Sequence, residues 1–201
     1  MGDLKNMKIK NALISVSDKK KLNDILKILK KYKIRLISSG GTYKKIKSLG
    51  YDCIEVSNYT NFPEILDGRV KTLHPKIHSG ILFKRHNVLH KKTLKKLNFE
   101  SIDLVITNFY PFEKTLNQTK NHNRIIENID IGGPTLVRSA AKNYNDVVVI
   151  TKIDQYKELV EELKLHKGKT SLKFRIKMSM KAFSETASYD TNIYNYFHSI
   201  S

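Results

Sequence analysis

Short apolar segments alternate with amphipathic segments along the first part of the chain, and this alternation constrains the fold most. The apolar run 11–16 precedes a stretch that opens at Asp18 and repeats leucine and isoleucine at helical spacing. The apolar run 34–37 precedes a small polar turn and a helical segment at 43–49, which ends at Gly50. A repeated order of strand and helix is typical of a parallel sheet covered on both faces. We therefore predict an α/β fold with a doubly wound, mainly parallel sheet flanked by helices.

Later segments continue the same pattern. They are predicted as strands at 52–56, 102–107 and 146–150, and as helices at 90–97, 134–142, 155–165 and 172–197. The region from Asn58 to Ser79 is polar and has no clear period, and a long loop in a compact domain is usually functional or disordered. We expect residues 1–150 to form one domain and residues 151–201 to form a packed helical extension.

Composition narrows the choice of partner. The formal net charge of +18 would suit nucleic acid, but the lysines follow nearly every amphipathic stretch instead of forming one patch. We therefore expect no nucleic-acid partner, although such a charge would also attract a phosphorylated small molecule. The single cysteine, Cys53, fits a reducing cytoplasm and is interpreted as a small hydrophobe. No apolar run reaches about 18 residues, which predicts a cytoplasmic protein without a membrane partner.

Polar and small residues follow the predicted strands, where parallel sheets bind their ligands. Ser39, Gly40, Gly41 and Thr42 lie between a strand and a helix, so their main-chain N–H groups can approach a phosphate. The alternative is a structural turn, which glycine also serves.

A second group follows the first predicted strand. Ser15 and Ser17 alternate along it and Lys19 comes just beyond, a pattern that would suit a second wall of the phosphate site. In the alternative interpretation, Ser17 or Asp18 only caps the next helix.

Two further segments carry groups that suit proton transfer or recognition. Arg69 and Lys71 precede a rigid His-Pro pair; lysine can shift its pKa and transfer protons, whereas arginine holds oxygens. Asp130 precedes a helix that carries Lys142, and helical spacing alone leaves open whether these two side chains meet.

His74 and His78, like His86 and His90, have a spacing that zinc can use, but without a nearby glutamate or thiolate we expect no metal.

Four strings resemble the IMP cyclohydrolase domain of the bifunctional purine biosynthesis proteins, which join that enzyme to AICAR transformylase. They are ALISVSDK at 12–19, SGGT at 39–42, NFPEILDGRVKTLHP at 61–75 and DIGGPTLVRSAAKN at 130–143, and the resemblance runs through nearly the whole chain. It implies a methylglyoxal-synthase-like, nucleotide-binding catalytic domain over residues 1–150. The implied reaction is the dehydrative closure of a formylated aminoimidazole carboxamide ribonucleotide (FAICAR) to IMP, without a cofactor.

The resemblance also implies a site. The phosphate would lie near Ser17, Lys19 and residues 39–42, and the base and ribose near the remaining matched positions. The candidate substrate-binding residues are Ser15, Ser17, Asp18, Lys19, Ser39, Gly40, Gly41, Thr42, Arg69, Val70, Thr72, Thr107, Ile131, Gly132 and Gly133. The candidate proton-transfer residues are Lys71, Tyr110, Asp130 and Lys142. We add Asn108, as a group that would polarise the formyl oxygen together with Lys71.

Two departures from the family accompany this interpretation. Lys20 and Lys21 stand where the family usually has threonine and glycine, which puts one hydroxyl contact and the turn in question. The chain also stops where a transformylase domain would begin, so we expect no transformylase activity from it and consider a homodimer or a separate transformylase as partner. The alternatives are a catalytically inactive effector-binding module, a methylglyoxal synthase and a nucleic-acid binder.

Overall fold

A five-stranded parallel sheet forms the centre of the protein in a computed structural model, which describes residues 6–201. Its strands lie in the order β4-β3-β2-β5-β6, and neighbouring strands are parallel throughout. Their bounds are Asn11–Val16 for β2, Arg35–Ser38 for β3, Ile54–Glu55 for β4, Leu104–Asn108 for β5 and Val148–Ile150 for β6. The predicted α/β class with a mainly parallel sheet is therefore confirmed.

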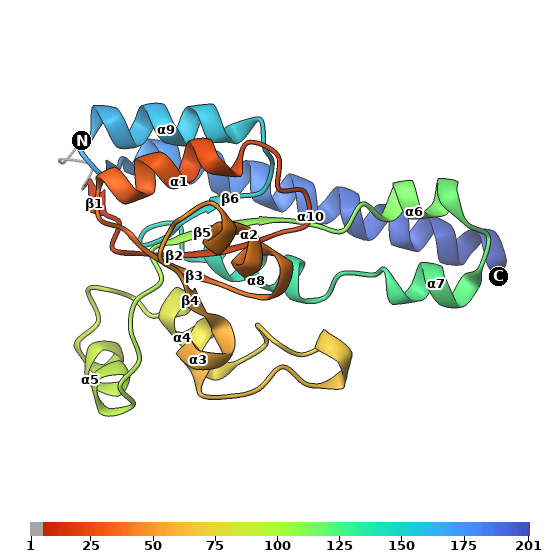
Figure 1. The fold of residues 1–201 in the computed structure, drawn as a ribbon, viewed down its shortest axis with the longest axis horizontal. Coiled ribbons are helices and arrows are strands. Elements are labelled where there is room, and N and C mark those ends of the chain that lie inside the picture. The colour runs from red at the N-terminus through yellow and green to blue at the C-terminus, as the bar shows by residue number, and fades with distance from the viewer. Residues whose placement is uncertain (1–5) are drawn as a thin grey trace.

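Helices flank this sheet. They are α1 (Leu22–Lys31), α2 (Gly40–Ser48), α3 (Val56–Thr60), α4 (Pro75–Leu82), α5 (Val88–Lys96), α6 (Phe112–Gln118), α7 (His122–Glu127), α8 (Gly132–Lys142), α9 (Gln155–Leu165) and α10 (Leu172–Ile200). Figure 1 shows α1 and α9 side by side above the strands. α8 packs against β5 and β6 and contacts α10, so the long last helix is anchored on the domain that precedes it.

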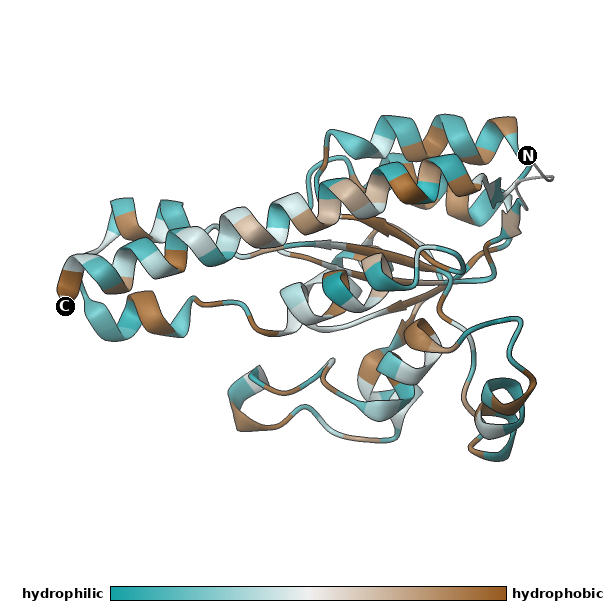
Figure 2. Cartoon of the chain, turned by 180° about the vertical axis from the view of Figure 1, so that it is seen from behind, coloured by the Kyte–Doolittle hydropathy of each residue, from teal (hydrophilic) through white to brown (hydrophobic). Residues whose placement is uncertain are grey.

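Burial explains why these segments form these elements. The side chains of Ala12, Leu13 and Ile14 are fully buried, as expected for a strand covered on both faces. In α1 the buried side chains recur at helical spacing, at Leu22, Ile25, Leu26 and Leu29. Figure 2 accordingly shows hydrophobic strands beneath helices that carry hydrophilic residues on their outer sides.

The C-terminal part of α10 extends beyond the sheet together with α6 and α7 (Figure 1). A second, smaller apolar cluster joins these helices around the buried side chains of Phe112, Ile125 and Tyr189. This cluster lies next to the loops that follow β5, so α10 reaches the edge of the sheet where ligands of such folds bind.

Several boundaries differ from those predicted. The helix expected to open at Asp18 begins at Leu22, and the strand expected at 52–56 is reduced to Ile54–Glu55 because α3 starts at Val56. The segment from Asn58 to Ser79, which shows no period in the sequence, contains the end of α3, a 3₁₀ turn at Leu66–Gly68 and most of α4. The sequence pattern also did not predict α6, α7 or the two-stranded antiparallel sheet, which consists of β1 (Met7–Lys8) and β7 (Lys169–Thr170). All of these are short, so apolar periodicity has little length in which to appear.

Candidate functional site

Ligands of parallel sheets bind in the crevice at the topological switch point, which the strand order places between β2 and β5. The chain adds β3 and β4 on one side of β2 and then returns to add β5 and β6 on the other, which makes β2 and β5 the topological switch point. Register pairs Val16 with Asn108 at their carboxyl ends. The Asn108 side chain accepts a hydrogen bond from the Asp18 N–H (2.9 Å) and donates one to the Asp18 carbonyl (3.0 Å). Asn108 therefore fixes the turn that carries Lys19.

Two lysines converge on the start of α2. Gly40 has a φ of +51°, a conformation that favours glycine. A methyl group in place of the Gly41 hydrogen would lie 3.7 Å from Nζ of Lys19, and one on Gly40 would lie 3.7 Å from Nζ of Lys71. The first main-chain N–H groups of a helix have no partner within it, so this end of α2 offers N–H donors and two ammonium groups to one anion.

The hydroxyl groups near this turn have mostly structural partners. Thr42 Oγ1 accepts from the Val16 N–H (3.1 Å) and donates to the Val16 carbonyl (2.9 Å), which joins α2 to the end of β2. Ser39, the residue before α2, is 7% exposed and makes no capping hydrogen bond with its side chain. The structure thus places Gly40, Gly41 and Thr42 in the first turn of α2 instead of in a loop before it, and it assigns the Thr42 hydroxyl to packing.

Lys71 connects the start of α2 with the other half of the site. Its ammonium group lies 3.2 Å from Oε1 of Glu64 and close enough to Asp130 to favour the ionised carboxyl. Lys71 follows a hairpin in which Ile65 and Val70 pair through their main chains. The hairpin is held to α7 by Arg69, which donates two hydrogen bonds to Glu127 at 3.1 and 2.7 Å.

The loop after Lys71 contacts the start of α8. Thr72 is 4% exposed, and a methyl group on Gly132 would lie 3.0 Å from its Oγ1. His78 in α4 lies beside this contact, with its Nδ1 3.1 Å from the Ser139 hydroxyl. Burial lowers the pKa of its imidazole, and the main chain of Thr72 partly offsets that shift. Glycine at position 132 therefore allows the two loops to approach.

Asp130 is the most constrained acid of the site. Its carboxylate accepts a hydrogen bond from the Gly133 N–H at 2.8 Å. Its own N–H donates to the Tyr189 hydroxyl at 2.8 Å. Burial raises the pKa of Asp130 above its ordinary value of 3.8, against smaller opposing effects from the Gly133 and Tyr110 main chains and Lys71. Such a carboxylate is a stronger base than an exposed one.

Other predicted site residues lie on β2, on β5 and on the loops that follow these strands or precede α8. Ser15 and Thr107 pair across β2 and β5, and the Ser17 carbonyl accepts from Lys19 Nζ (3.2 Å). The side chains of Tyr110 and Ile131 are exposed at the edge of the crevice.

Lys142 lies apart from the other candidate proton-transfer residues. It ends α8, ten residues and therefore about 15 Å from Gly132 along the helix. Its side chain is exposed and, within residues 6–201, makes no hydrogen bond or ion pair. The structure does not bring it to Asp130, and its role stays a prediction.

Three residues of the site were not predicted from the sequence. Glu64 pairs with Lys71, His78 contacts Ser139 of α8, and Tyr189 holds Asp130. Tyr189 lies 59 residues from Asp130 along the chain, and nothing in the spacing of either residue indicates the contact. The family string at 61–75 contains Glu64, and the stretch from Tyr189 to Phe197 also resembles the end of the family's domain, but neither resemblance assigned these residues to the site.

The paired histidines have local partners. Nδ1 of His74 accepts from the Lys76 N–H and caps α4, and Nδ1 of His90 accepts from the Lys84 N–H. Among residues 6–201, no three His, Cys, Asp or Glu side chains lie close enough to hold a metal ion. In the same part of the chain, no helix is long and apolar enough to cross a membrane.

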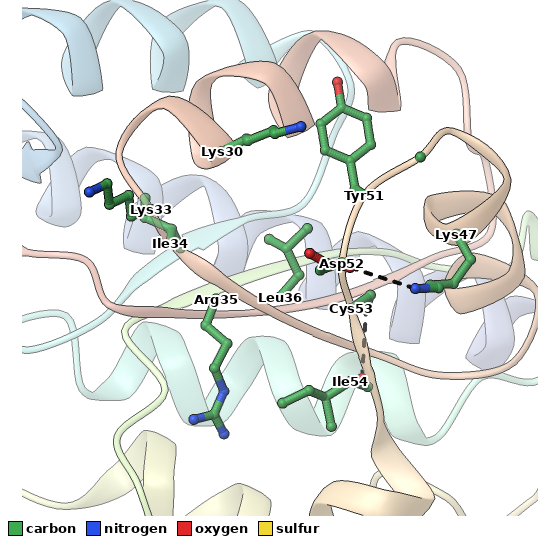
Figure 3. Close-up of a pocket in the computed structure, with 11 residues that line it drawn as sticks. Lys30, Lys33, Ile34, Arg35, Leu36, Lys47, Tyr51, Asp52, Cys53 and Ile54 are labelled. Carbon is green, nitrogen blue, oxygen red and sulfur yellow. Dashed lines mark hydrogen bonds and ion pairs between the residues drawn. The ribbon is translucent and has the colours of Figure 1, made fainter.

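A cavity of about 450 Å³ lies at the opposite end of the sheet, beside the start of β3 (Figure 3). It contains none of the predicted site residues. Lys30 lies over the Tyr51 ring, 5.6 Å from its centre, and Lys47 lies 3.8 Å from Asp52. Cys53 lines this cavity, and burial raises the pKa of its thiol to about 12, so the sulfur stays protonated and unreactive.

A glycine-bearing helix start with two lysines beside it, at the switch point of a parallel sheet, defines the class of protein, and sequence comparison agrees with it. Residues 21–135 match the MGS-like domain family, and the chain therefore belongs to that family. The remaining helices, at residues 140–201, match a second family described as the AICARFT/IMPCHase bienzyme. The two matches together cover β3 to β6, the loops at 39–42, 61–75 and 130–133, and α10, whereas β2 and the turn at Lys19 precede both.

The most informative relatives are longer proteins. The chain is 51% identical over 189 residues to the bifunctional purine biosynthesis protein PurH of Acetivibrio thermocellus, and 50% identical over 188 residues to PurH of Clostridioides difficile. These alignments cover 94% of this chain but only 37% and 36% of the relatives. The crystal structure of ForH superposes with a TM-score of 0.82 at 26% identity, covering 94% of this chain and 99% of that one. The chain thus spans little more than a third of the PurH proteins it resembles.

Proposed function

We propose that this chain is an IMP cyclohydrolase, which closes the second purine ring of FAICAR to give IMP and water. The observation that carries the proposal is the position of Lys71, between the start of α2 and the buried carboxylate of Asp130. A nucleotide whose phosphate binds at α2 would have its base beside these two groups. Similarity to the PurH proteins supports the same reaction.

The phosphate subsite would consist of the first N–H groups of α2 and the ammonium group of Lys19. Lys19 is fixed indirectly by Asn108, whose amide bonds the main chain of Asp18. Because both polar atoms of that amide already have main-chain partners, we assign Asn108 the task of holding this turn instead of polarising the formyl oxygen. The charge of Lys71 serves that purpose.

Ring closure requires an attack within one molecule. The carboxamide nitrogen bonds to the formyl carbon and gives one proton to Asp130, while the formyl oxygen takes a proton and becomes the hydroxyl of a carbinolamine. The hydroxyl then leaves as water, and the former formamido nitrogen gives up its proton as the ring double bond forms. Tyr110, at the edge of the crevice, would donate the proton to the departing hydroxyl.

The enzyme's main contribution would be to hold the two arms of the substrate together, since a fixed near-attack geometry removes rotational freedom before the reaction. Lys71 would add stabilisation of the charge that develops on the formyl oxygen. Burial makes Asp130 a stronger proton acceptor than an exposed carboxylate, because it moves the pKa of that carboxyl upward.

The proposal is tested by adding purified protein to FAICAR and following the ultraviolet change of purine formation, without folate or metal. Conversion that scales with protein concentration supports a cyclohydrolase. A folded protein that binds IMP in calorimetry but converts no FAICAR would instead be an effector-binding module. Release of phosphate and a dicarbonyl from dihydroxyacetone phosphate would indicate a methylglyoxal synthase.

A further inference from the structure

Tyr189 brings the long C-terminal helix into contact with the candidate site. Its hydroxyl accepts the hydrogen bond from the Asp130 N–H at 2.8 Å, and the residue is only 7% exposed. The ring packs against Phe109, which directly follows β5, with centres 5.0 Å apart, and against Phe112 of α6 at 6.2 Å. Tyr189 is therefore fixed by the apolar cluster beneath it, and it has one polar contact with the site.

The side chain and the main chain of Asp130 have separate hydrogen-bond partners. Its side chain accepts a hydrogen bond from the main-chain N–H of Gly133, whereas its main-chain N–H donates to the Tyr189 hydroxyl. A methyl group on Gly133 would lie 2.5 Å from Oδ2 of Asp130, so the carboxylate fills the space above that glycine. The Asp130 N–H is partly buried, and losing its partner would be costly, so we expect the loop around Asp130 to move toward water if the hydroxyl is removed.

We propose that Tyr189 is a positioning residue, which holds the carboxylate of Asp130 in the orientation that proton transfer needs. The inference rests on the proposed function, because Asp130 is the proton acceptor there. It gives α10 a task in the reaction, although none of its side chains is proposed to touch the substrate.

Tyr189 does not itself transfer the proton. Burial raises the pKa of its phenol to about 12, and the charges of Asp130 and Asp190 add to that rise. The phenol therefore stays neutral over the working pH range, and its hydrogen bond to Asp130 does not titrate. The charged group that faces Asp130 from the opposite loop is Lys71, which favours the ionised carboxylate.

The chain offers a matched control for Tyr189→Phe. Tyr196 lies two turns further along α10, packs in the same apolar cluster and also uses its hydroxyl, but toward Nδ1 of His122 at 2.8 Å. Tyr196→Phe therefore removes the same atom from the same helix without affecting Asp130. We expect Tyr189→Phe to lower kcat on the order of tenfold with KM little changed, because the phosphate subsite lies apart from this contact. Tyr196→Phe should retain the wild-type kcat.

A double substitution separates positioning from general stability. If Tyr189 acts through Asp130, then Tyr189→Phe should have no further effect on kcat in an Asp130→Asn background. An equal further loss in that background, or equal kcat values for Tyr189→Phe and Tyr196→Phe, would overturn the inference.

A second readout does not depend on turnover. Amide hydrogen exchange at Asp130, followed by NMR, should be at least several-fold faster in Tyr189→Phe than in the wild type or in Tyr196→Phe. Unchanged exchange overturns the inference. Failure of the wild type to convert FAICAR would overturn only the proposed function, and faster exchange confined to Tyr189→Phe would still show that this hydroxyl holds Asp130.

Discussion

Arg69 and Glu127 join the hairpin at 65–70 to α7 through two hydrogen bonds of 3.1 and 2.7 Å. Both side chains are exposed, and exposed ion pairs contribute little to stability because water and salt screen them. Glu127 therefore competes only weakly with a ligand for the guanidinium group that we assign to nucleotide binding.

Replacement of the acid in this pair tests the assignment. Glu127→Gln should lower the KM for FAICAR about twofold to fivefold, because Arg69 no longer has an anionic partner to leave. Arg69→Ala should raise KM. If both variants raise KM equally, the pair serves only to hold the hairpin and Arg69 does not bind nucleotide. Steady-state kinetics at low ionic strength distinguishes the two results.

Neighbouring lysines allow a second comparison, at the phosphate subsite. Nζ of Lys19 lies beside Gly41 at the start of α2, whereas the Lys20 side chain is 83% exposed. Lys19→Met should weaken IMP binding on the order of tenfold, since a charge-assisted hydrogen bond to phosphate is lost. Lys20→Met should leave the Kd within a factor of about two to three of wild type, on the order of a surface-charge effect. Calorimetric titration with IMP measures both, and equal losses would argue against a phosphate at α2.

Asp130 should make the protein less stable as pH rises. Burial raises the folded-state pKa of this carboxyl above 3.8, so between the two pKa values the folded state binds more protons than the unfolded state. The free energy of unfolding therefore falls as pH rises through that interval. Asp130→Asn removes this dependence and should raise Tm at pH 7 relative to wild type.

That gain should disappear at about pH 3, where the wild-type carboxyl is protonated in both states. Thermal melts at the two pH values check the sign. A gain of equal size at both would show that ionisation of Asp130 is not its cause.

Lys21 adopts a conformation that favours glycine. It precedes α1 with a φ of +55°, at the position where the related family usually has glycine. Lys21→Gly should increase the free energy of unfolding by about 0.5–1 kcal/mol, because relief of the left-handed strain outweighs the added freedom of the unfolded chain.

The same substitution inside the helix is the control. Lys27 lies on the exposed face of α1, where glycine has no strain to relieve, so Lys27→Gly should destabilise by about 1 kcal/mol. Urea unfolding measures both variants. Destabilisation by Lys21→Gly would show that position 21 carries no left-handed strain.

The sheet and the turn at α2 were predictable because each depends on residues close together in the chain. Alternation of apolar runs indicates β2 and β3, and glycines directly after a strand indicate the anion site. The contact between Asn108 and Asp18 spans 90 residues, and that between Tyr189 and Asp130 spans 59. Such contacts depend on how the elements pack. Periodicity does not record them, which is why the sequence alone suggests a catalytic role for Asn108 and none for Tyr189.

The helix α4 shows a different limit. Its N-terminal cap is the imidazole of His74, whose Nδ1 accepts from the Lys76 N–H. Histidine is not among the residues that usually mark a helix start, and only Ile77, Gly80 and Ile81 are buried. The Pro75 at the first helical position was the one signal available.

The most direct test of Asp130 as the base compares the wild type with Asp130→Asn. The turnover of FAICAR by each protein is followed by ultraviolet absorbance, and the affinity of each for IMP is measured separately. We predict ring closure by the wild type and a loss in kcat on the order of 100-fold or more in Asp130→Asn, with IMP affinity nearly unchanged. Equal turnover by the two proteins would contradict this mechanism, because the buried carboxylate would then have no part in the reaction.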